Sequence, residues 1–279
     1  MLKNKPLILV TNDDGINSPG IEVLKNSLLE LGEVIIIAPD MQRSAVSSAL
    51  TIHKPLRVRR FYKNGDFFGY SVDGNPADCV KLAVSTLLDR KPDLVVSGIN
   101  HGKNTSINVL YSGTVAGATE GVLAGINSIA ISHASHALNS DLVLSGKVSN
   151  ILARILLNTM HRQKVLLNVN LPDLADREVK GIKLTRLSSS KWADKYERRE
   201  DPFGNEYYWF AGVFMISEID TATDDGAVEN GFVSVSPISL NLYDNSRLDE
   251  DIFSELNDEF ADFNRGLRGR YGTGGAGTE

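Results

Sequence analysis

Cysteine is almost missing from this sequence: among 279 residues there is one, Cys79. A single cysteine cannot form an intramolecular disulfide, and it cannot supply the several thiolates of a cysteine metal site. The surrounding segment, PADCVKLAV, has apolar residues at helical spacing, which predicts that Cys79 is a small core residue. Disulfide-stabilised scaffolds and cysteine zinc sites are thereby excluded.

Long apolar runs are missing as well. No segment approaches the roughly 18 consecutive apolar residues of a membrane span. Lys3 and Lys5 interrupt the stretch before Leu7, where a signal peptide would have its apolar region. We therefore expect a cytoplasmic protein without a membrane partner.

Positive charge is in deficit, since 29 Lys and Arg stand against 35 Asp and Glu, for a formal net charge of −6. This balance argues against a nucleic-acid polymer as the main partner. A small anionic substrate would need a local cation, and a bound metal ion is the simplest source.

Several catalytic and nucleotide-binding motifs are absent. The glycines form no Walker A pattern, and the first apolar segment is not followed by GxGxxG, which weakens ATPase and dinucleotide-binding interpretations. No HExxH spacing or serine elbow occurs around the five histidines, which are His53, His101, His133, His136 and His161. His101 directly follows Asn100; we interpret it as a loop histidine, and a position in the binding crevice is the alternative.

The order of apolar segments predicts an α/β domain. Over the first 135 residues, short apolar runs such as LILV, EVIIIAPD and PDLVVSGIN alternate with helical patterns, as in a parallel sheet covered by helices. LILV shows no polar alternation, which is typical of a strand buried on both faces. Ser18 followed by Pro19, and Asn75 followed by Pro76, are typical helix starts.

The composition changes from about Gly181 onward. Residues 181–211 are aromatic, charged and β-prone, with a turn signal at 201–205, and they have too few apolar residues for a separate core. We expect an extended hairpin arm at about 181–235, within one domain covering residues 1–265, and a late strand in GFVSVSPISLNLY. The glycine-rich tail, 266–279, is expected to be disordered.

Polar side chains follow three of the expected strands. Asp13 and Asp14 end the first, Asp40 and the segment MQRSAVSS follow the second, and Asn100 ends the third. Ligands bind beyond the carboxyl ends of strands in such a sheet, so these residues are expected to share one crevice. Carboxylate, hydroxyl and carboxamide oxygens suit Mg²⁺, Mn²⁺ or Ca²⁺ better than zinc.

Asp13 and Asp14 need a turn to act together, because neighbours on a regular strand point to opposite faces. Gly15 directly after them permits a sharp turn that brings both to one side. The alternative is that one caps a helix and the other is solvated.

The segment YSGTVAGATEG is a second candidate site. Backbone N–H groups at a helix start, with the hydroxyls of Ser112 and Thr114 and close approach permitted by Gly113, would suit a phosphate. Asn104 in the preceding loop can hydrogen-bond a phosphate oxygen. The alternatives are a capped structural helix and an ordinary turn asparagine.

Five motifs occur in fixed order: TNDDGINSPGI, APDMQRSAVSSALT, VDGNPADCV, DLVVSGINHGKN and YSGTVAGATEG. Together with NVNLP, TRL, DPFGNEYYWFAG and TDDGAVENGFVSVSP, they resemble the SurE (survival protein E) family of metal-dependent acid phosphatases from about Leu7 to Leu242. The resemblance implies a Rossmann-like, mostly parallel sheet with helices on both faces and a C-terminal β-hairpin arm. It also implies a homodimer or homotetramer formed through that arm, and hydrolysis of nucleoside 5'-monophosphates, with 3'-monophosphates as further substrates.

The resemblance assigns roles to residues. It implies one divalent ion per subunit, Mg²⁺ or Mn²⁺ with Ca²⁺ as a third candidate, bound by Asp13, Asp14, Ser44 and Asn100. It implies a phosphate pocket lined by Asn12, Asn104, Ser112, Gly113 and Thr114, and catalysis by Asp13, Asp14, Asn104 and Ser112. The residues alone do not separate Ser44 from Ser47 or Ser48.

Ser106 and Asn108 depart from the family pattern, which usually has glycine and aspartate there. The loss of an acid beside the phosphate segment leaves open a non-catalytic regulator that keeps the nucleotide and metal pocket. A sugar-nucleotide transferase is a third alternative, but the arm after Gly181 does not resemble the second nucleotide-binding lobe that it would need.

Overall fold

The computed structural model describes residues 5–137, 139–159, 164–175, 178–241, 254–261 and 265. The chain divides into two compact units, Met1–Ile238 and Ser239–Glu279, and residues 254–261 of the second unit are helical. The tail 266–279 and His161 lie outside the described residues, and the prediction of one domain over residues 1–265 stays a prediction.

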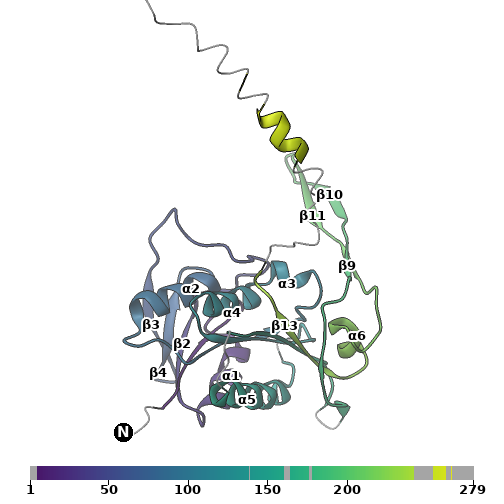
Figure 1. Cartoon of the computed structure of the whole chain (residues 1–279). Helices are drawn as coiled ribbons and strands as arrows, with labels where there is room; N and C mark the ends of the chain where they lie inside the picture. The colour runs from purple at the N-terminus through teal and green to yellow at the C-terminus, as the bar shows by residue number, and fades with distance from the viewer. Residues whose placement is uncertain are drawn as a thin grey trace, which may run out of the picture. The chain divides into compact units, whose positions relative to one another are not determined.

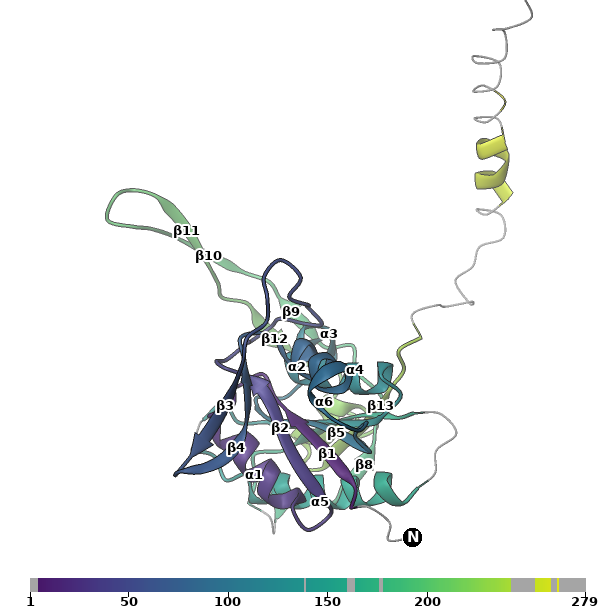
Figure 2. The same cartoon turned by 90° about the vertical axis from the view of Figure 1, so that its left-hand side faces the viewer.

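The described part of the first unit is built on one sheet of nine strands, in the order β3-β4-β2-β1-β5-β6-β7-β13-β8 (Figures 1 and 2). Their bounds are β1 (Leu7–Thr11), β2 (Glu33–Pro39), β3 (Val58–Lys63), β4 (Asp66–Val72), β5 (Leu94–His101), β6 (Asn127–His133), β7 (Leu166–Leu171), β8 (Ile182–Leu184) and β13 (Val233–Ile238). Neighbours pair in parallel except β3 with β4 and β7 with β13. The prediction of a mostly parallel sheet is confirmed.

Helices cover both faces of this sheet, as expected. Figure 1 shows α1 (Pro19–Leu28) and α5 (Val143–Asn158) on one face, with α2 (Pro76–Leu82) and α4 (Gly113–Leu123) on the other. A π-helical turn, η1 (Ala83–Leu87), continues α2. Successive residues of β1 belong to different cores: Ile8 and Val10 pack with the α1 and α5 side, Leu9 with the α2 side.

Small residues let α4 lie close to the sheet. A Cβ added at Gly117 would come within 2.9 Å of Thr11 Cγ2, and one at Gly121 within 2.3 Å of Ser128 Oγ. The prediction that this small-residue helix packs closely is confirmed. Because α4 cannot move outward without opening the core, its first turn is fixed relative to the end of β1.

The hairpin of β3 and β4 escaped the sequence prediction. Its turn is Asn64-Gly65, with φ of 53° and 90°. Asparagine followed by glycine between two β-prone runs is a strong hairpin signal, so the sequence carried the information.

The arm consists of two short antiparallel ladders. β9 (Lys191–Ala193) pairs with β12 (Val213–Met215), and β10 (Tyr196–Glu200) pairs with β11 (Glu206–Phe210), as Figure 2 shows. The turn at 201–205 lies where it was predicted. The arm is shorter than expected, because β8, α6 (Asp224–Glu229) and β13 belong to the main body.

No helix among the residues that the structure describes is long and apolar enough to cross a membrane. Cys79 is fully buried, as predicted, and burial raises the pKa of its thiol far above the usual range.

Candidate functional site

A cavity of about 350 Å³ lies among the segments that follow β1 and β2 and that end β5. We call it the active-site cavity. Six of the nine residues that the sequence analysis assigned to the metal or the phosphate line it: Asp13, Asp14, Ser44, Asn100, Asn104 and Ser112. The expected convergence of three strand ends is therefore present in the fold.

Both adjacent aspartates reach this cavity because the chain turns directly after β1. Gly15 has a φ of 94°, and Arg43 donates its backbone N–H to the Asp13 carbonyl at 2.7 Å. Asp40 takes no part: its carboxylate pairs with Arg43 at 3.1 Å, and it does not line the cavity. The turn predicted from Gly15 is confirmed.

Three residues expected at the phosphate lie behind the cavity. Asn12 is fully buried, and its side-chain amide donates to the Gly15 carbonyl at 3.0 Å and to Ser18 Oγ at 2.7 Å. Thr114 donates its hydroxyl to Asp13, and Gly113 packs against the Asp13 side chain. Asn12 therefore stabilises the turn after β1, and Thr114 and Gly113 position the Asp13 carboxylate. None of the three lines the cavity.

The hydrogen bonds of the loop after β2 distinguish Ser44 from Ser47. Ser47 donates its N–H to the Tyr111 carbonyl at 2.9 Å and its hydroxyl to the Leu110 carbonyl at 2.7 Å. Ala45 and Ser47 both have positive φ, 54° and 51°, so the loop bends back on either side of Val46. Ser44 lines the cavity, whereas Ser47 holds the loop on α3 (Asn108–Tyr111).

Asn100 is oriented at the end of β5. Its side-chain amide donates to the Gly102 carbonyl at 2.6 Å, which assigns the nitrogen and leaves the oxygen as the atom suited to a cation. The neighbouring His101 N–H donates to Asp14 at 3.3 Å. The Gly98–Ile99 peptide bond before Asn100 is cis.

Asn104 is held from several sides. Its backbone N–H donates to Asn170 Oδ1 at 2.7 Å, and its carbonyl accepts from Asn168 Nδ2 at 2.7 Å. Its side-chain amide donates to Ser132 Oγ at 2.9 Å. Strands β6 and β7 thus fix a residue that lines the cavity.

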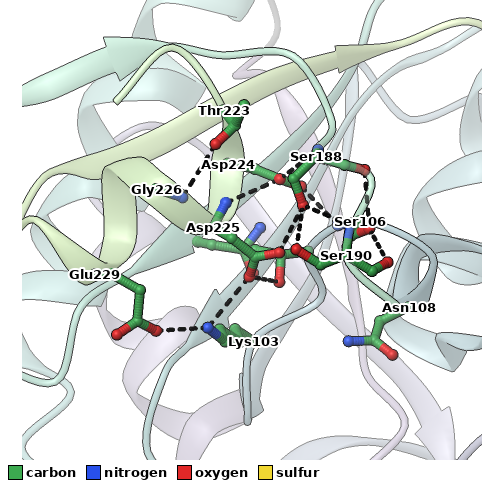
Figure 3. A network of polar contacts seen from close by, with 12 residues as sticks. Lys103, Ser106, Asn108, Ser188, Ser190, Thr223, Asp224, Asp225, Gly226 and Glu229 are labelled. Atoms are coloured by element: carbon green, nitrogen blue, oxygen red, sulfur yellow. Dashed lines mark hydrogen bonds and ion pairs between the residues drawn. The ribbon is translucent and has the colours of Figure 1, made fainter. Parts of the chain in front are cut away.

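Acids of α6 hold the loop around Asn104 (Figure 3). Asp225 accepts from the hydroxyls of Thr105 and Ser188 at 2.6 Å each, and lies 3.2 Å from Lys103 Nζ. Lys103 also pairs with Glu229 at 2.7 Å. Although burial alone would lower the pKa of Lys103, its two acidic partners raise it, so the ammonium stays charged at the cavity wall.

A family model described as Survival protein SurE matches residues 8–194 of this chain. The chain belongs to the SurE family. The protein named 5'-nucleotidase SurE from Chlorobaculum tepidum is 43% identical over 240 residues, covering 86% of this chain and 91% of that protein. Its counterpart from Christiangramia forsetii is 44% identical over 247 residues, covering 87% and 94%. The crystal structure of a SurE protein from Aquifex aeolicus superposes with a TM-score of 0.76 at 40% identity, covering 88% of this chain and 98% of that one.

Ser106 and Asn108, where the resemblance implies glycine and aspartate, both have hydrogen-bond partners. Ser106 has a φ of 52°, a conformation that favours glycine. Its backbone N–H donates to Asp224 at 2.7 Å, and its hydroxyl contacts the carbonyls of Ser188 and Ser190. Asn108 Oδ1 accepts from the indole N–H of Trp192 at 2.8 Å. Both side chains are part of the fold's polar contacts.

The acids of this SurE chain are electrostatically poised for a cation. Burial raises the pKa of Asp13 to about 6; the Thr114 hydrogen bond opposes this shift, and the nearby charge of Asp14 adds to it. Burial also raises the pKa of Asp14, against the hydrogen bond from the His101 N–H. Two crowded carboxylates that resist ionisation are stabilised when a cation shares them.

The donor set fits a hard divalent ion. Among the described residues, no three side chains of His, Cys, Asp or Glu gather as a metal-binding group. A cation bound here would have two carboxylates with the neutral oxygens of Ser44 and Asn100. Magnesium and manganese accept such oxygen ligands together with water, whereas a structural zinc site needs more nitrogen or sulfur ligands.

Several cavity residues escaped the sequence reasoning: Lys103, Tyr111, His136, Trp192 and Phe214. His136 comes after β6, and its ring lies against Gly102. Trp192 and Phe214 come from the arm, and only the concentration of aromatics there gave a signal. The interpretation of His101 as a loop histidine is wrong: it is the last residue of β5 and lines the cavity, and burial lowers the pKa of its imidazole.

Proposed function

We propose that this protein is a phosphomonoesterase that hydrolyses nucleoside 5'-monophosphates to nucleoside and phosphate. Relatives that carry the name 5'-nucleotidase SurE support this substrate class, because they align over most of the chain. The observation on which the proposal rests is that Asp13 and Asp14 line one cavity together with Asn100 and Ser112, which lie far from them in sequence. Nucleoside 3'-monophosphates are proposed as further substrates.

Asp13, Asp14, Ser44 and Asn100 would hold one divalent ion, Mg²⁺ or Mn²⁺ in the first place and Ca²⁺ as a third candidate. When bound, such an ion polarises a phosphoryl oxygen and neutralises charge that develops during transfer. Thr114 and Gly113 keep the Asp13 carboxylate in place beneath that position.

The phosphate would lie between Asn104 and the start of α4. Ser112 Oγ accepts from the Val115 N–H at 3.1 Å, so its own hydroxyl proton can donate to a phosphate oxygen. Asn104 uses one amide hydrogen for Ser132 and has a second for the same purpose. Donors fixed before the substrate arrives stabilise transition-state charge without reorganisation.

We propose direct attack of water on phosphorus, with the bond to the nucleoside oxygen breaking and the leaving oxygen taking up a proton. Asp13 is poorly suited as a nucleophile, because it is only 7% exposed and its carboxylate accepts a hydrogen bond from the Thr114 hydroxyl. Capture of a phosphorylated Asp13 during turnover would contradict this mechanism.

Phosphate release from AMP tests the activity. We expect release with Mn²⁺ or Mg²⁺ and none after a chelator is added. AMP binding without release would favour a non-catalytic nucleotide-binding regulator, the alternative raised by Ser106 and Asn108.

Location and assembly are further proposals. We expect action in the cytoplasm on small-molecule substrates, with neither a membrane nor a nucleic-acid polymer as partner, and pairing of subunits through the arm. Aromatic side chains of β11, with Tyr208 57% and Trp209 61% exposed, support pairing by an apolar surface. Light scattering during gel filtration distinguishes monomer, dimer and tetramer.

A further inference from the structure

A second cavity, of about 690 Å³, adjoins the active-site cavity. The two share the wall residues Ala45, Asn108, Tyr111 and Trp192. A ligand that fills both would therefore pass along this wall, with one end beside Ser112 and the other among the arm residues Tyr196 and Phe210.

Four aromatic residues, Tyr111, Trp192, Tyr196 and Phe210, line the second cavity. Trp192 makes T-shaped contacts with Phe210 at 5.7 Å and with Phe214 at 5.4 Å between ring centroids, and Tyr196 packs on Phe210 at 5.5 Å. Tyr111 on the facing helix is 52% exposed. These rings support one another, so the wall is formed before any ligand binds.

Asn108 fixes the central ring of this wall. Its side-chain oxygen accepts the indole N–H of Trp192, and its own helix, α3, follows the loop that carries Asn104. The position of Trp192 is thus tied to the phosphate side of the site. A neutral amide here keeps the acceptor for the indole without placing a further negative charge beside a phosphate.

We propose that the second cavity is a base-binding subsite, in which a nucleobase stacks against Trp192 while the phosphate occupies the active-site cavity. This inference rests on the proposed function and names the part of the substrate that the arm recognises. Every nucleobase has a flat π-face, so a wall of this kind binds purines and pyrimidines alike. Lys191 and Asp194 at its edge offer polar contacts to the ring substituents.

Kinetics with matched substrates test the subsite. AMP has a base and ribose 5-phosphate has none, while both present the same phosphate ester. Base–aromatic stacking corresponds to a change of about 5- to 150-fold in binding. We expect Trp192→Ala to raise KM for AMP by about ten-fold or more, to leave KM for ribose 5-phosphate within about two-fold, and Trp192→Phe to restore most of the loss.

Tyr62→Ala is the control, since Tyr62 is an aromatic residue of β3, outside the arm, that lines neither cavity and is 53% exposed. It should leave both KM values unchanged. Equal loss on AMP and ribose 5-phosphate in Trp192→Ala, or equal effects of the two alanine variants, would overturn the proposal.

Fluorescence gives a second readout that needs no turnover. Trp192 and Trp209 are the two tryptophans of the sequence, so Trp209→Phe leaves Trp192 as sole reporter and Trp192→Phe leaves Trp209. Adenosine should quench the first variant and not the second; equal or absent quenching in both would overturn the subsite. If the wild-type protein released no phosphate but adenosine quenched Trp192, the catalytic proposal would fail and the base-binding subsite would stand.

Discussion

Thr114, in the first turn of α4, donates its hydroxyl to the carboxylate of Asp13, which lies 101 residues earlier in the chain. Gly113 approaches the same side chain so closely that an added Cβ would come within 2.8 Å of the Asp13 Cβ. The helix that presents Ser112 to the cavity therefore also positions Asp13.

Removal of the Thr114 hydroxyl should weaken the site without unfolding the protein. Thr114→Val keeps the shape but takes away a hydrogen bond to a charged group, a contribution of about 1.5–3 kcal/mol. We expect kcat/KM for AMP to fall about ten-fold or more. Thr114→Ser restores the donor and should recover most of the activity; equal activity of the valine and serine variants would contradict this role.

Asp13→Asn should lower AMP hydrolysis at least about 100-fold, because it removes half of the carboxylate charge available to the ion. Asp40→Asn is the control, because it is the same substitution at an aspartate in the loop after β2 that does not line the cavity. Phosphate release by both variants at saturating Mn²⁺ provides the comparison. A near wild-type rate for Asp13→Asn would remove the basis of the proposed metal site.

The pH dependence of cation binding follows from the raised pKa of Asp13. Burial raises this pKa from 3.8 to about 6, so the folded protein favours the protonated form of Asp13. The protonated carboxyl therefore contributes to folding stability. This contribution is complete below pH 3.8 and is lost as the pH rises through 6. A divalent ion needs the ionised carboxylate, so protons compete with it below about pH 6. We expect the apparent Mn²⁺ affinity to rise about ten-fold from pH 5 to pH 7. Calorimetry should detect proton release at pH 5; an affinity independent of pH would refute the coupling.

Much of the fold could be predicted because its signals are local. The strands around Leu9 and Val96 are continuous apolar runs, and Ser18 caps α1 as its position before Pro19 indicated. The ends of the arm could not be predicted, because β8 contains only three residues and pairs with β13, about fifty positions away. Such pairing depends on distant partners and leaves no periodic pattern of its own.

For the site, the sequence placed the acids but not their surroundings. The glycine after Asp14 was enough to predict the turn, since few other residues accept a φ of 94°. Nothing local distinguished Ser44 from Ser47, because the difference is a hydrogen bond from Ser47 to Leu110. Trp192 escaped for the same reason, as the fold of the arm brings it to the cavity.

Ser106, where the resemblance implies a glycine, offers a test of what a serine contributes at this position. At a φ of 52° serine is strained, by roughly 1–2 kcal/mol, but its hydroxyl contacts the carbonyls of Ser188 and Ser190. Ser106→Ala keeps the strain and loses these contacts, so we expect it to lower the free energy of unfolding by about 1–3 kcal/mol. Ser106→Gly removes the strain as well and should cost less. Urea denaturation measures the unfolding free energies of the two variants. A glycine variant less stable than the alanine variant would contradict this expectation.

The pair of Lys103 and Asp225 should matter far more than that of Lys103 and Glu229. Asp225 is fully buried and accepts from the hydroxyls of Thr105 and Ser188, so an amide nitrogen in Asp225→Asn would face these donors. We expect a loss of about 2–4 kcal/mol in unfolding free energy and a lower kcat, because the loop carrying Asn104 loses its support. Glu229→Gln changes the other partner of Lys103, which is 46% exposed, and should cost less than about 1 kcal/mol. Urea denaturation and AMP kinetics on both variants measure the difference; equal losses would show that the buried acid does not hold the loop.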